Sequence, residues 1–166
     1  AEMTQAFRLY GELKRPDKAA WAIDKARQQE AIKTTGQLKD ALHSLAPRGK
    51  ENKFFAQVFQ AIRIELNDEL GALRELLKQC TTLMPPEGRL VVMSYHSLED
   101  RLVKHFMRLG NFEDHVERDM RGAMLAPFKP LNRKAIMAEE QEQKENPRSR
   151  SARLRVAFRT DLPAES

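Results

Sequence analysis

The fold of this chain is decided by one stretch, Arg89-Leu90-Val91-Val92-Met93-Ser94-Tyr95-His96-Ser97-Leu98-Glu99-Asp100-Arg101. Its first half is a near-continuous apolar run, which is typical of a strand that is buried on both faces of a parallel sheet. Polar residues follow, and apolar residues then recur with helical spacing. Ser97 lies three residues before Asp100, which predicts a capping pair at a helix start. The stretch therefore predicts a strand, a tight polar turn and a helix.

The polar turn is the first candidate for a ligand site. In α/β sheets, ligands bind beyond the carboxyl ends of strands, and this turn lies at such an end. The alternative interpretation is purely structural: Ser97 caps the helix, His96 fills a loop and Arg101 is solvated. The residue types alone favour the structural interpretation.

The composition is that of a globular chain with a mild positive charge. The 166 residues suit one domain or parts of two, with 32% charged residues, 41% hydrophobic residues and a net charge of +5. Cys80 is the single cysteine, which excludes an internal disulfide, and its apolar helical surroundings predict a buried thiol. No apolar run approaches the roughly 20 residues that span a bilayer, and no signal peptide opens the chain. The expected location is the cytoplasm.

Residues 1 to about 46 predict a small helical unit. Pro16 suits the first turn of a helix, and Thr34 with Gln37 predicts a capping box at the start of another. Trp21 is interpreted as a packing anchor, with stacking on a nucleic-acid base as the alternative. Residues 47–53 predict a linker.

A single long helix is expected over residues 54–80, where apolar residues recur every three or four positions. Gly71 is its expected weak point. A second face carries Gln60, Arg63 and Asn67, spaced three and four residues apart. This face is either a solvated stripe or a set of polar groups that reaches the rim of the Ser94–Arg101 turn.

The C-terminal part changes character. A helix over about 98–109 should end at Gly110, and residues 111–147 predict a long excursion with one short helix near 133–143. Leu154, Val156 and Phe158 alternate with arginines, which predicts a half-buried strand with a basic outer face. That face is either a nucleic-acid contact or a solubilising sheet edge.

Two kinds of site are not expected in this chain. The four histidines lack the spacing of metal ligands around a shared partner, so no metal is predicted. The seven glycines are isolated, so no glycine-rich loop is predicted to take a nucleotide-like cofactor. Only two strands are expected.

Three stretches together resemble one family. They are Phe59-Gln60-Ala61-Ile62-Arg63-Ile64-Glu65-Leu66-Asn67-Asp68-Glu69-Leu70, then Gly88–Lys104 around the opening stretch, then Asn146-Pro147-Arg148-Ser149-Arg150-Ser151-Ala152-Arg153-Leu154-Arg155-Val156. Their order and spacing resemble the bacterial ribosomal RNA small-subunit methyltransferase H family, also called MraW. Two departures stand out: Glu87 replaces a usual glycine, and Tyr95 replaces a usual phenylalanine.

The resemblance implies an α/β fold, the C-terminal part of a Rossmann-like, S-adenosylmethionine-dependent methyltransferase with part of an inserted helical domain. Residues 1–50 would be the later part of the insertion, and residues 51–166 the C-terminal part of the methyltransferase domain. The family methylates the N4 atom of a cytidine in small-subunit ribosomal RNA. Its cofactor-binding half has no counterpart here, so no cofactor-binding residue is assigned in this chain.

The resemblance and the chemistry together select nine site residues. Ser94, His96 and Ser97 are expected to orient the target cytidine or to brace the loop that does. The expected substrate-binding residues are Arg63, Asn67, Arg101, Arg148, Arg150 and Arg153, of which the last three would contact RNA phosphates. Glu99 and Asp100 are expected to cap and support rather than act as general bases. The expected partner is small-subunit ribosomal RNA, with no membrane, and exposed sheet edges leave a homodimer open. The alternative function is a non-catalytic basic RNA-binding module.

Overall fold

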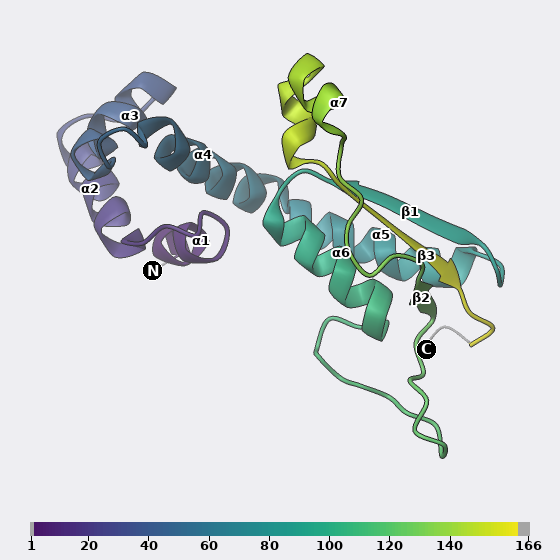
Figure 1. The fold of residues 1–166 in the computed structure, drawn as a ribbon. Coiled ribbons are helices and arrows are strands. Elements are labelled where there is room, and N and C mark those ends of the chain that lie inside the picture. Colours follow the sequence, from purple (N-terminus) through teal and green to yellow (C-terminus); the bar gives the residue numbers. More distant parts are fainter. Residues whose placement is uncertain (1, 163–166) are drawn as a thin grey trace. The chain divides into compact units, whose positions relative to one another are not determined.

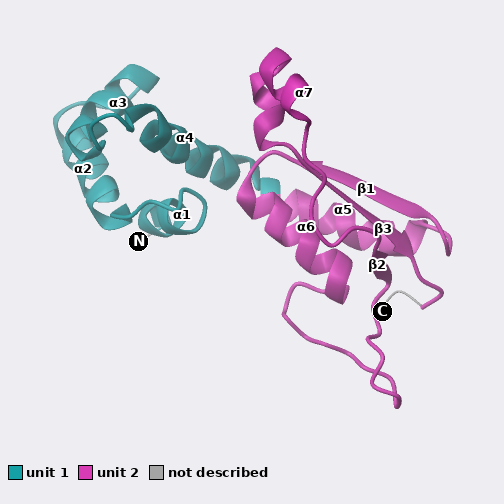
Figure 2. Cartoon of the chain, in the orientation of Figure 1, with its two compact units in different colours: residues 1–69 teal, residues 70–166 magenta. Residues whose placement is uncertain are grey.

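The computed structural model describes residues 2–162, which divide after residue 69 into two compact units (Figure 2). The chain is mixed helix and sheet, with a three-stranded sheet in the second unit. The division between units falls after residue 69, whereas the expected domain boundary lay at residue 50. The helix that starts at Glu51 therefore groups with the helices before it.

The first unit is entirely helical (Figure 1). Its elements are α1 (Glu2–Leu9), α2 (Pro16–Gln29), α3 (Thr35–Leu42), a 3-10 turn (His43–Leu45) and α4 (Glu51–Asn67). Pro16 opens α2, and the Thr34–Gln37 capping box at α3 is present in full, so both predictions are confirmed. The core packs Phe7, Leu42 and Val58 together.

Trp21 is not a packing anchor. Its side chain is 64% exposed, and Lys25 Nζ lies 5.1 Å from the ring centroid. The buried face of α2 is made instead by small and aliphatic residues, Ala19, Ala20 and Ile23.

The expected single long helix is interrupted at Asp68 rather than weakened at Gly71. Asp68 adopts a left-handed conformation with φ of 47°, which ends α4. A new helix, α5 (Glu69–Leu83), starts at the next residue. Aspartate tolerates this conformation better than most residues, and the apolar period continues through the break, so the pattern alone could not locate it.

The second unit carries the sheet. Its remaining elements are β1 (Arg89–Ser94), α6 (Ser97–Leu109), β2 (Phe128–Pro130), α7 (Glu140–Glu145), a 3-10 helix (Pro147–Ser151) and β3 (Arg153–Arg159). The strand order is β1-β3-β2, and β3 is antiparallel to both neighbours. β2 was not expected from the sequence, and α7 begins later than the predicted short helix.

β1 is not buried on both faces, and its pairing within this chain is antiparallel. Leu90 and Ser94 are buried, whereas Val91 and Met93 are 55% and 53% exposed. The structure describes no strand on the second edge of β1, and Val91 itself stays more than half exposed. Part of the hydrophobic surface of this apolar run is therefore left uncovered by the other residues in the range 2–162.

Helices α5 and α6 cover the other face of the sheet (Figure 1). Leu77 of α5 and Phe106 of α6 pack with Leu90, Phe128 and Ala157 of the three strands. Cys80 is half-buried beside this core, and burial raises the pKa of its thiol. The predicted buried thiol is thus only partly buried.

The basic outer face predicted for β3 is wrong. Arg155 and Arg159 are only 9% and 6% exposed, because they lie on the helix-covered face together with Ala157. Leu154 and Val156 lie on the opposite face and remain half-exposed. Burial of these two arginines is tolerated because each guanidinium has its own acceptors.

Candidate functional site

The turn between β1 and α6 is organised by His96, not by Ser97. His96 is the residue before the helix, and its Nδ1 accepts a hydrogen bond from the Glu99 backbone N–H at 3.3 Å. The Glu99 carboxylate in turn accepts a hydrogen bond from the Tyr95 N–H at 3.1 Å. The predicted Ser97–Asp100 capping pair is therefore wrong. An imidazole replaces the usual hydroxyl cap, and Glu99 closes the turn from the other side.

The second ring nitrogen of His96 is left available. Nε2 lies 3.3 Å from Glu99 Oε1 but has no hydrogen-bond partner among the described residues. The side chain is 9% exposed. A buried polar atom without a partner is costly unless something binds it. His96 can thus meet a ligand with one nitrogen while the other holds the helix end.

Asp100 fixes α6 to the sheet. Its carboxylate accepts two hydrogen bonds from Arg155, at 2.7 Å from Nε and 3.0 Å from Nη2. The two side chains are 15% and 11% exposed, so the pair is largely shielded from water. This bidentate contact holds the first turn of α6 against the central strand and so positions the His96 turn.

The remaining predicted residues of the turn differ in exposure. Ser94 is buried, and its hydroxyl donates a long hydrogen bond of 3.5 Å to the Arg153 carbonyl of the paired strand. Ser97 and Arg101 are exposed on the first two turns of α6. Ser94 therefore braces the strand end, whereas Ser97 and Arg101 face outward.

A cleft of about 710 Å³ lies beside this turn. Its walls include Met93, Tyr95, Met137 and Leu154, and its rim includes Arg148. Ser149 also lines the cleft, and its buried hydroxyl has no hydrogen-bond partner among the described residues.

The structure brings the cleft to the end of β1, although sequence reasoning did not select Tyr95, Met137 or Ser149 as site residues. Tyr95 was signalled only by its place between Ser94 and His96. Nothing local marks Met137, because it reaches β3 through the Ile136–Leu154 bridge. Arg148 and Arg150 are both exposed on the 3-10 helix, and Arg153 is half-buried with Nη1 4.0 Å from Met137 Sδ.

Arg63 and Asn67 belong to the first unit and gather around one carboxylate there. Arg63 Nε lies 2.7 Å from Glu69 Oε1, and Asn67 Nδ2 donates to the same oxygen at 3.4 Å. Gln60 donates to the Tyr10 carbonyl at 2.9 Å. The polar stripe is therefore not simply solvated, since each member has a partner within its own unit.

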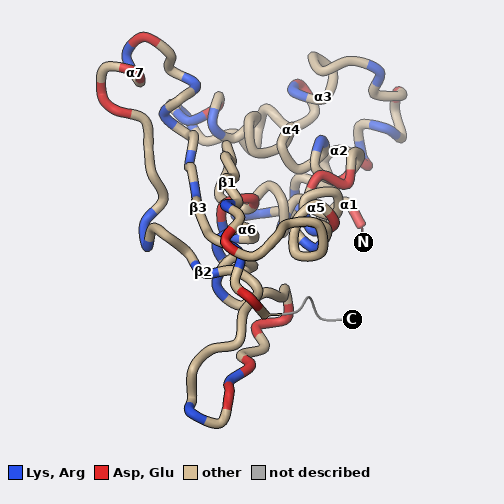
Figure 3. Tube along the Cα trace, turned by 90° about the vertical axis from the view of Figure 1, so that its right-hand side faces the viewer, with Lys and Arg blue, Asp and Glu red and all other residues tan. Residues whose placement is uncertain are grey.

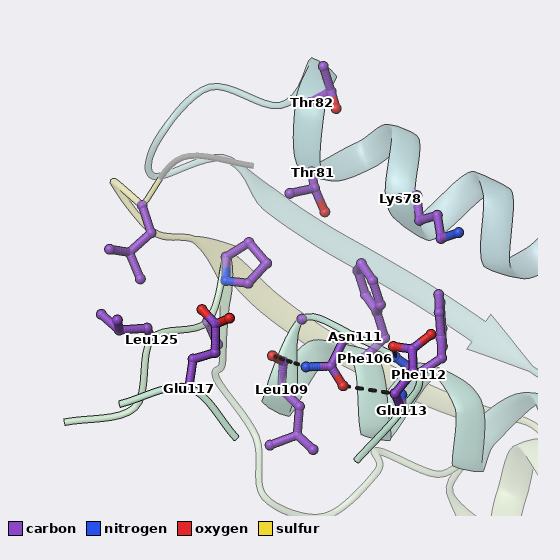
Figure 4. A pocket seen from close by; sticks show the side chains of 14 residues that line it. Lys78, Thr81, Thr82, Phe106, Leu109, Asn111, Phe112, Glu113, Glu117 and Leu125 are labelled. Carbon is purple, nitrogen blue, oxygen red and sulfur yellow. Dashed lines mark hydrogen bonds between the residues drawn. The ribbon is translucent and has the colours of Figure 1, made fainter. Parts of the chain in front are cut away.

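A second cavity, of about 580 Å³, lies at the far end of α6 (Figure 4). It is lined by Phe106, Phe112, Lys78 and Glu117 among others. Asn111 shapes its floor by donating to the Leu109 carbonyl at 3.4 Å and accepting from the Glu113 N–H at 3.2 Å. Because α6 begins beside His96 and ends at Leu109, this cavity is separate from the His96 turn.

The carboxyl end of β1 lacks a glycine cradle. Gly88 precedes β1 and Gly110 follows α6, so every position of the turn at residues 95–97 carries a side chain. Close approach of backbone to a nucleoside or phosphate usually needs glycine. None of the helices described is long and apolar enough to cross a membrane.

Known proteins match nearly the whole chain. The MraW methylase family matches residues 1–160. The ribosomal RNA small subunit methyltransferase H of Amoebophilus asiaticus is 54% identical over 160 residues, which are 96% of this chain and 52% of that protein. The proteins of the same name from Parabacteroides distasonis and Cytophaga hutchinsonii are each 48% identical, over 93% and 91% of this chain.

The chain spans about half the length of these relatives, 50% to 52%. The family match nevertheless extends over both compact units and includes the β1–α6 turn and the arginine-rich segment before β3. This chain belongs to the MraW methylase family.

Proposed function

We propose that this chain is the C-terminal part of an S-adenosylmethionine-dependent methyltransferase that modifies the N4 atom of a cytidine in small-subunit ribosomal RNA. Its family membership and the names of its relatives support this proposal. The observation that carries the site assignment is the His96 turn, where a buried imidazole nitrogen without a partner lies at the carboxyl end of β1. The proposed location is the cytoplasm.

The proposed task of this half is to hold the target base. The N4 amine of cytosine is a weak nucleophile, because its lone pair is delocalised into the ring. Acceptors for its N–H groups and a fixed orientation would raise its reactivity. Because Nδ1 of His96 accepts the Glu99 N–H, Nε2 of the neutral ring is an N–H donor and would donate to a ring acceptor of the base. The exposed Ser97 hydroxyl would accept from an N4 N–H, and Ser94 would brace the strand end. Glu99 and Asp100 position the turn through their hydrogen bonds.

The base must leave its stack to reach such a site. The cleft beside the turn offers Tyr95, Met93 and Leu154 as an apolar wall for the displaced base. Arg148 and Arg150 would contact phosphates from the rim, with Arg153 beside them. Arg101 would contact the substrate from α6, and substrate binding by Arg63 and Asn67 stays a prediction.

We propose that the methyl donor binds mainly to residues outside this chain. The lack of a glycine cradle and the double length of the relatives support this assignment. S-adenosylmethionine would supply the methyl group when bound. Calorimetry with S-adenosylmethionine should detect no tight binding to residues 1–166 but clear binding to the full-length gene product. Tight binding to residues 1–166 would contradict the assignment.

The catalytic proposal is tested by two substitutions at one position in the full-length gene product. His96→Asn keeps a good helix cap, whereas His96→Ala removes it. Both should slow methyl transfer from radiolabelled S-adenosylmethionine to unmodified small subunits by about 100-fold or more, in line with typical acid–base and positioning contributions. Only His96→Ala should also lower the melting temperature.

Wild-type turnover in His96→Asn would reduce His96 to a capping residue. The second candidate function, a basic RNA-binding module without catalysis, would be favoured if the full-length product bound RNA but transferred no methyl group. The buried Arg155 and Arg159 weaken that candidate, because two arginines of the basic strand are committed to internal contacts.

A further inference from the structure

A basic groove of about 650 Å³ lies in the second unit, and none of the residues assigned above to substrate binding lines it. It runs between α6 and the segment that follows β2. Met107 and Leu131 form its apolar floor, and Val156 of β3 also lines it. Its walls carry four exposed cations, Lys104, Arg108, Arg133 and Lys134. No acidic side chain lines the groove in the part of the chain that the structure describes.

The four cations are not neutralised internally. None of them forms an ion pair with any residue in the range 2–162. Arg155, which also lines the groove, differs because its Nε and Nη2 both donate to the Asp100 carboxylate. The groove therefore gathers an excess of positive charge in a concave place, where the field is focused. Cations placed together in this way repel each other unless an anion joins them.

The segment that carries two of these cations is held in place. Asn132 accepts a hydrogen bond from the Val156 N–H at 2.9 Å and donates one to the Lys134 carbonyl at 2.6 Å. The Leu131 N–H donates to the Val156 carbonyl at 2.8 Å. The groove is thus preformed rather than assembled by the ligand, which lowers the entropy cost of binding. Figure 3 shows Lys and Arg in blue along the chain between β2 and α7.

The opposite wall continues toward the candidate site. Arg101, Lys104 and Arg108 are spaced three and four residues apart on α6, so they share one face. Successive members are about one helical turn, roughly 5.4 Å, apart. A line of cations therefore runs from the first turn of α6, which His96 caps, into the groove. A regularly charged strand would follow such a line.

We propose that this groove binds the phosphodiester backbone of single-stranded RNA next to the nucleotide that enters the His96 turn. This inference rests on the proposed function for the identity of the ligand. The four free cations supply sequence-independent phosphate contacts, and the apolar floor accommodates the sugar edge. Lys104, Arg108, Arg133 and Lys134 are therefore substrate-binding residues.

The test compares two double variants of the full-length gene product that lose the same charge. Lys104→Gln with Arg108→Gln removes one wall of the groove. Lys78→Gln with Arg121→Gln removes one lysine and one arginine elsewhere in the second unit. The probe is a fluorescein-labelled single-stranded RNA 20-mer, and anisotropy titrations at several KCl concentrations give the dissociation constant and its salt slope. Thermal melting of both variants checks that the fold is kept.

The groove variant should bind the probe roughly tenfold more weakly at 100 mM KCl, with a salt slope reduced by about 1.4, which is about 0.7 for each lost phosphate contact. The control variant should keep the wild-type slope. Equal losses in both variants would overturn the groove as a site, because net charge alone would then explain binding. Full competition by millimolar inorganic phosphate would overturn it as an RNA site, since a single anion would suffice.

The RNA-binding test of the groove can succeed or fail independently of the proposed methyl transfer. Methyl transfer to small subunits is measured separately on the wild-type protein. A groove-dependent salt slope without any methyl transfer would support the groove and contradict the enzyme. Methyl transfer with no difference between the two double variants would support the enzyme and contradict the groove.

Discussion

Some side chains of the candidate site stabilise the local backbone as well as being available to a ligand. His96 shows this most clearly, because one ring nitrogen caps α6 while the other has no hydrogen-bond partner within residues 2–162. A histidine in a polar turn is easily interpreted as either structural or functional. Here a single side chain combines a capping role with a free nitrogen, so the two interpretations are not exclusive.

Glu87 provides a prediction at the residue scale. It adopts φ of 65°, a left-handed conformation that costs a residue with a side chain about 1 kcal/mol more than glycine. Glu87→Gly should therefore raise the free energy of unfolding by roughly 0.5 kcal/mol after the entropy cost of glycine is subtracted. Urea denaturation measures this change, and a lower midpoint would contradict the assignment.

Asp100 carries the second prediction. Asp100→Ala leaves the Arg155 guanidinium buried without its partner, which should cost about 3 kcal/mol of unfolding free energy. The control is Glu75→Ala, because the Lys78–Glu75 pair is 60% and 65% exposed and should contribute less than about 0.5 kcal/mol. Adding Arg155→Met to Asp100→Ala should recover part of the loss. Equal effects of Asp100→Ala and Glu75→Ala would exclude a structural role for the buried pair.

Among the elements, α6 has the best-defined ends. Gly110 ends it with φ of 81°, as the sequence predicted. A Cβ atom at Gly110 would lie 2.2 Å from Pro127 Cδ, whereas a Cβ at Gly122, which also has φ of 81°, would meet nothing within 4 Å.

Gly110→Ala should therefore cost at least about 2 kcal/mol, because steric overlap adds to the conformational strain. Gly122→Ala should cost only about 1 kcal/mol, since strain is its single penalty. Thermal unfolding of the two variants gives the comparison. If their melting temperatures fell equally, the contact between Gly110 and Pro127 would not contribute to stability.

Elements with strong local signals were predictable, and those defined by distant contacts were not. Pro16, the Thr34–Gln37 box and Gly110 mark helix ends through local hydrogen bonds and dihedral angles. β2 has only three residues, and its identity depends on pairing with a strand about 30 positions later. Neither the hydrophobic periodicity of the sequence nor a turn motif predicts that these two strands pair.

The orientation of β3 shows a different limit. Strict alternation divides its residues between two faces but does not say which face is covered. The hydrophobic side chains of Leu154 and Val156 predicted that their face would be buried. In the structure, the face that carries Arg155 and Ala157 is the one covered by the helices. The deciding contacts are the Asp100 carboxylate on α6 and the backbone carbonyls of Thr81 and Pro127 around Arg159. Each comes from a distant part of the chain.

At the scale of the whole molecule, the sheet leaves apolar surface uncovered. Val91, Met93 and Tyr95 are each more than half exposed, and β1 has one edge without a partner strand in the described part of the chain. Exposed edges of this kind favour pairing between copies.

Residues 1–166 should therefore self-associate as concentration rises. Val91→Lys should weaken this association, because a lysine on an edge strand discourages pairing. Leu83→Lys is the matched control, since Leu83 is 78% exposed and ends helix α5 rather than lying in an edge strand. Sedimentation velocity between micromolar and 100-micromolar protein measures the effect. A wild-type chain that stayed monomeric throughout would contradict the homodimer expectation.

The strand order has a consequence for biosynthesis. β3 lies in the middle of the sheet, yet both of its neighbours precede it in the chain, and its pairing partner Ser94 is translated 59 residues before Arg153. While the ribosome is still adding the arginine-rich segment, the two outer strands of the nascent chain have no mutual contact. The sheet can close only after translation passes Arg159. A premature stop before that codon should leave a product that chaperones and proteases recognise as unfinished.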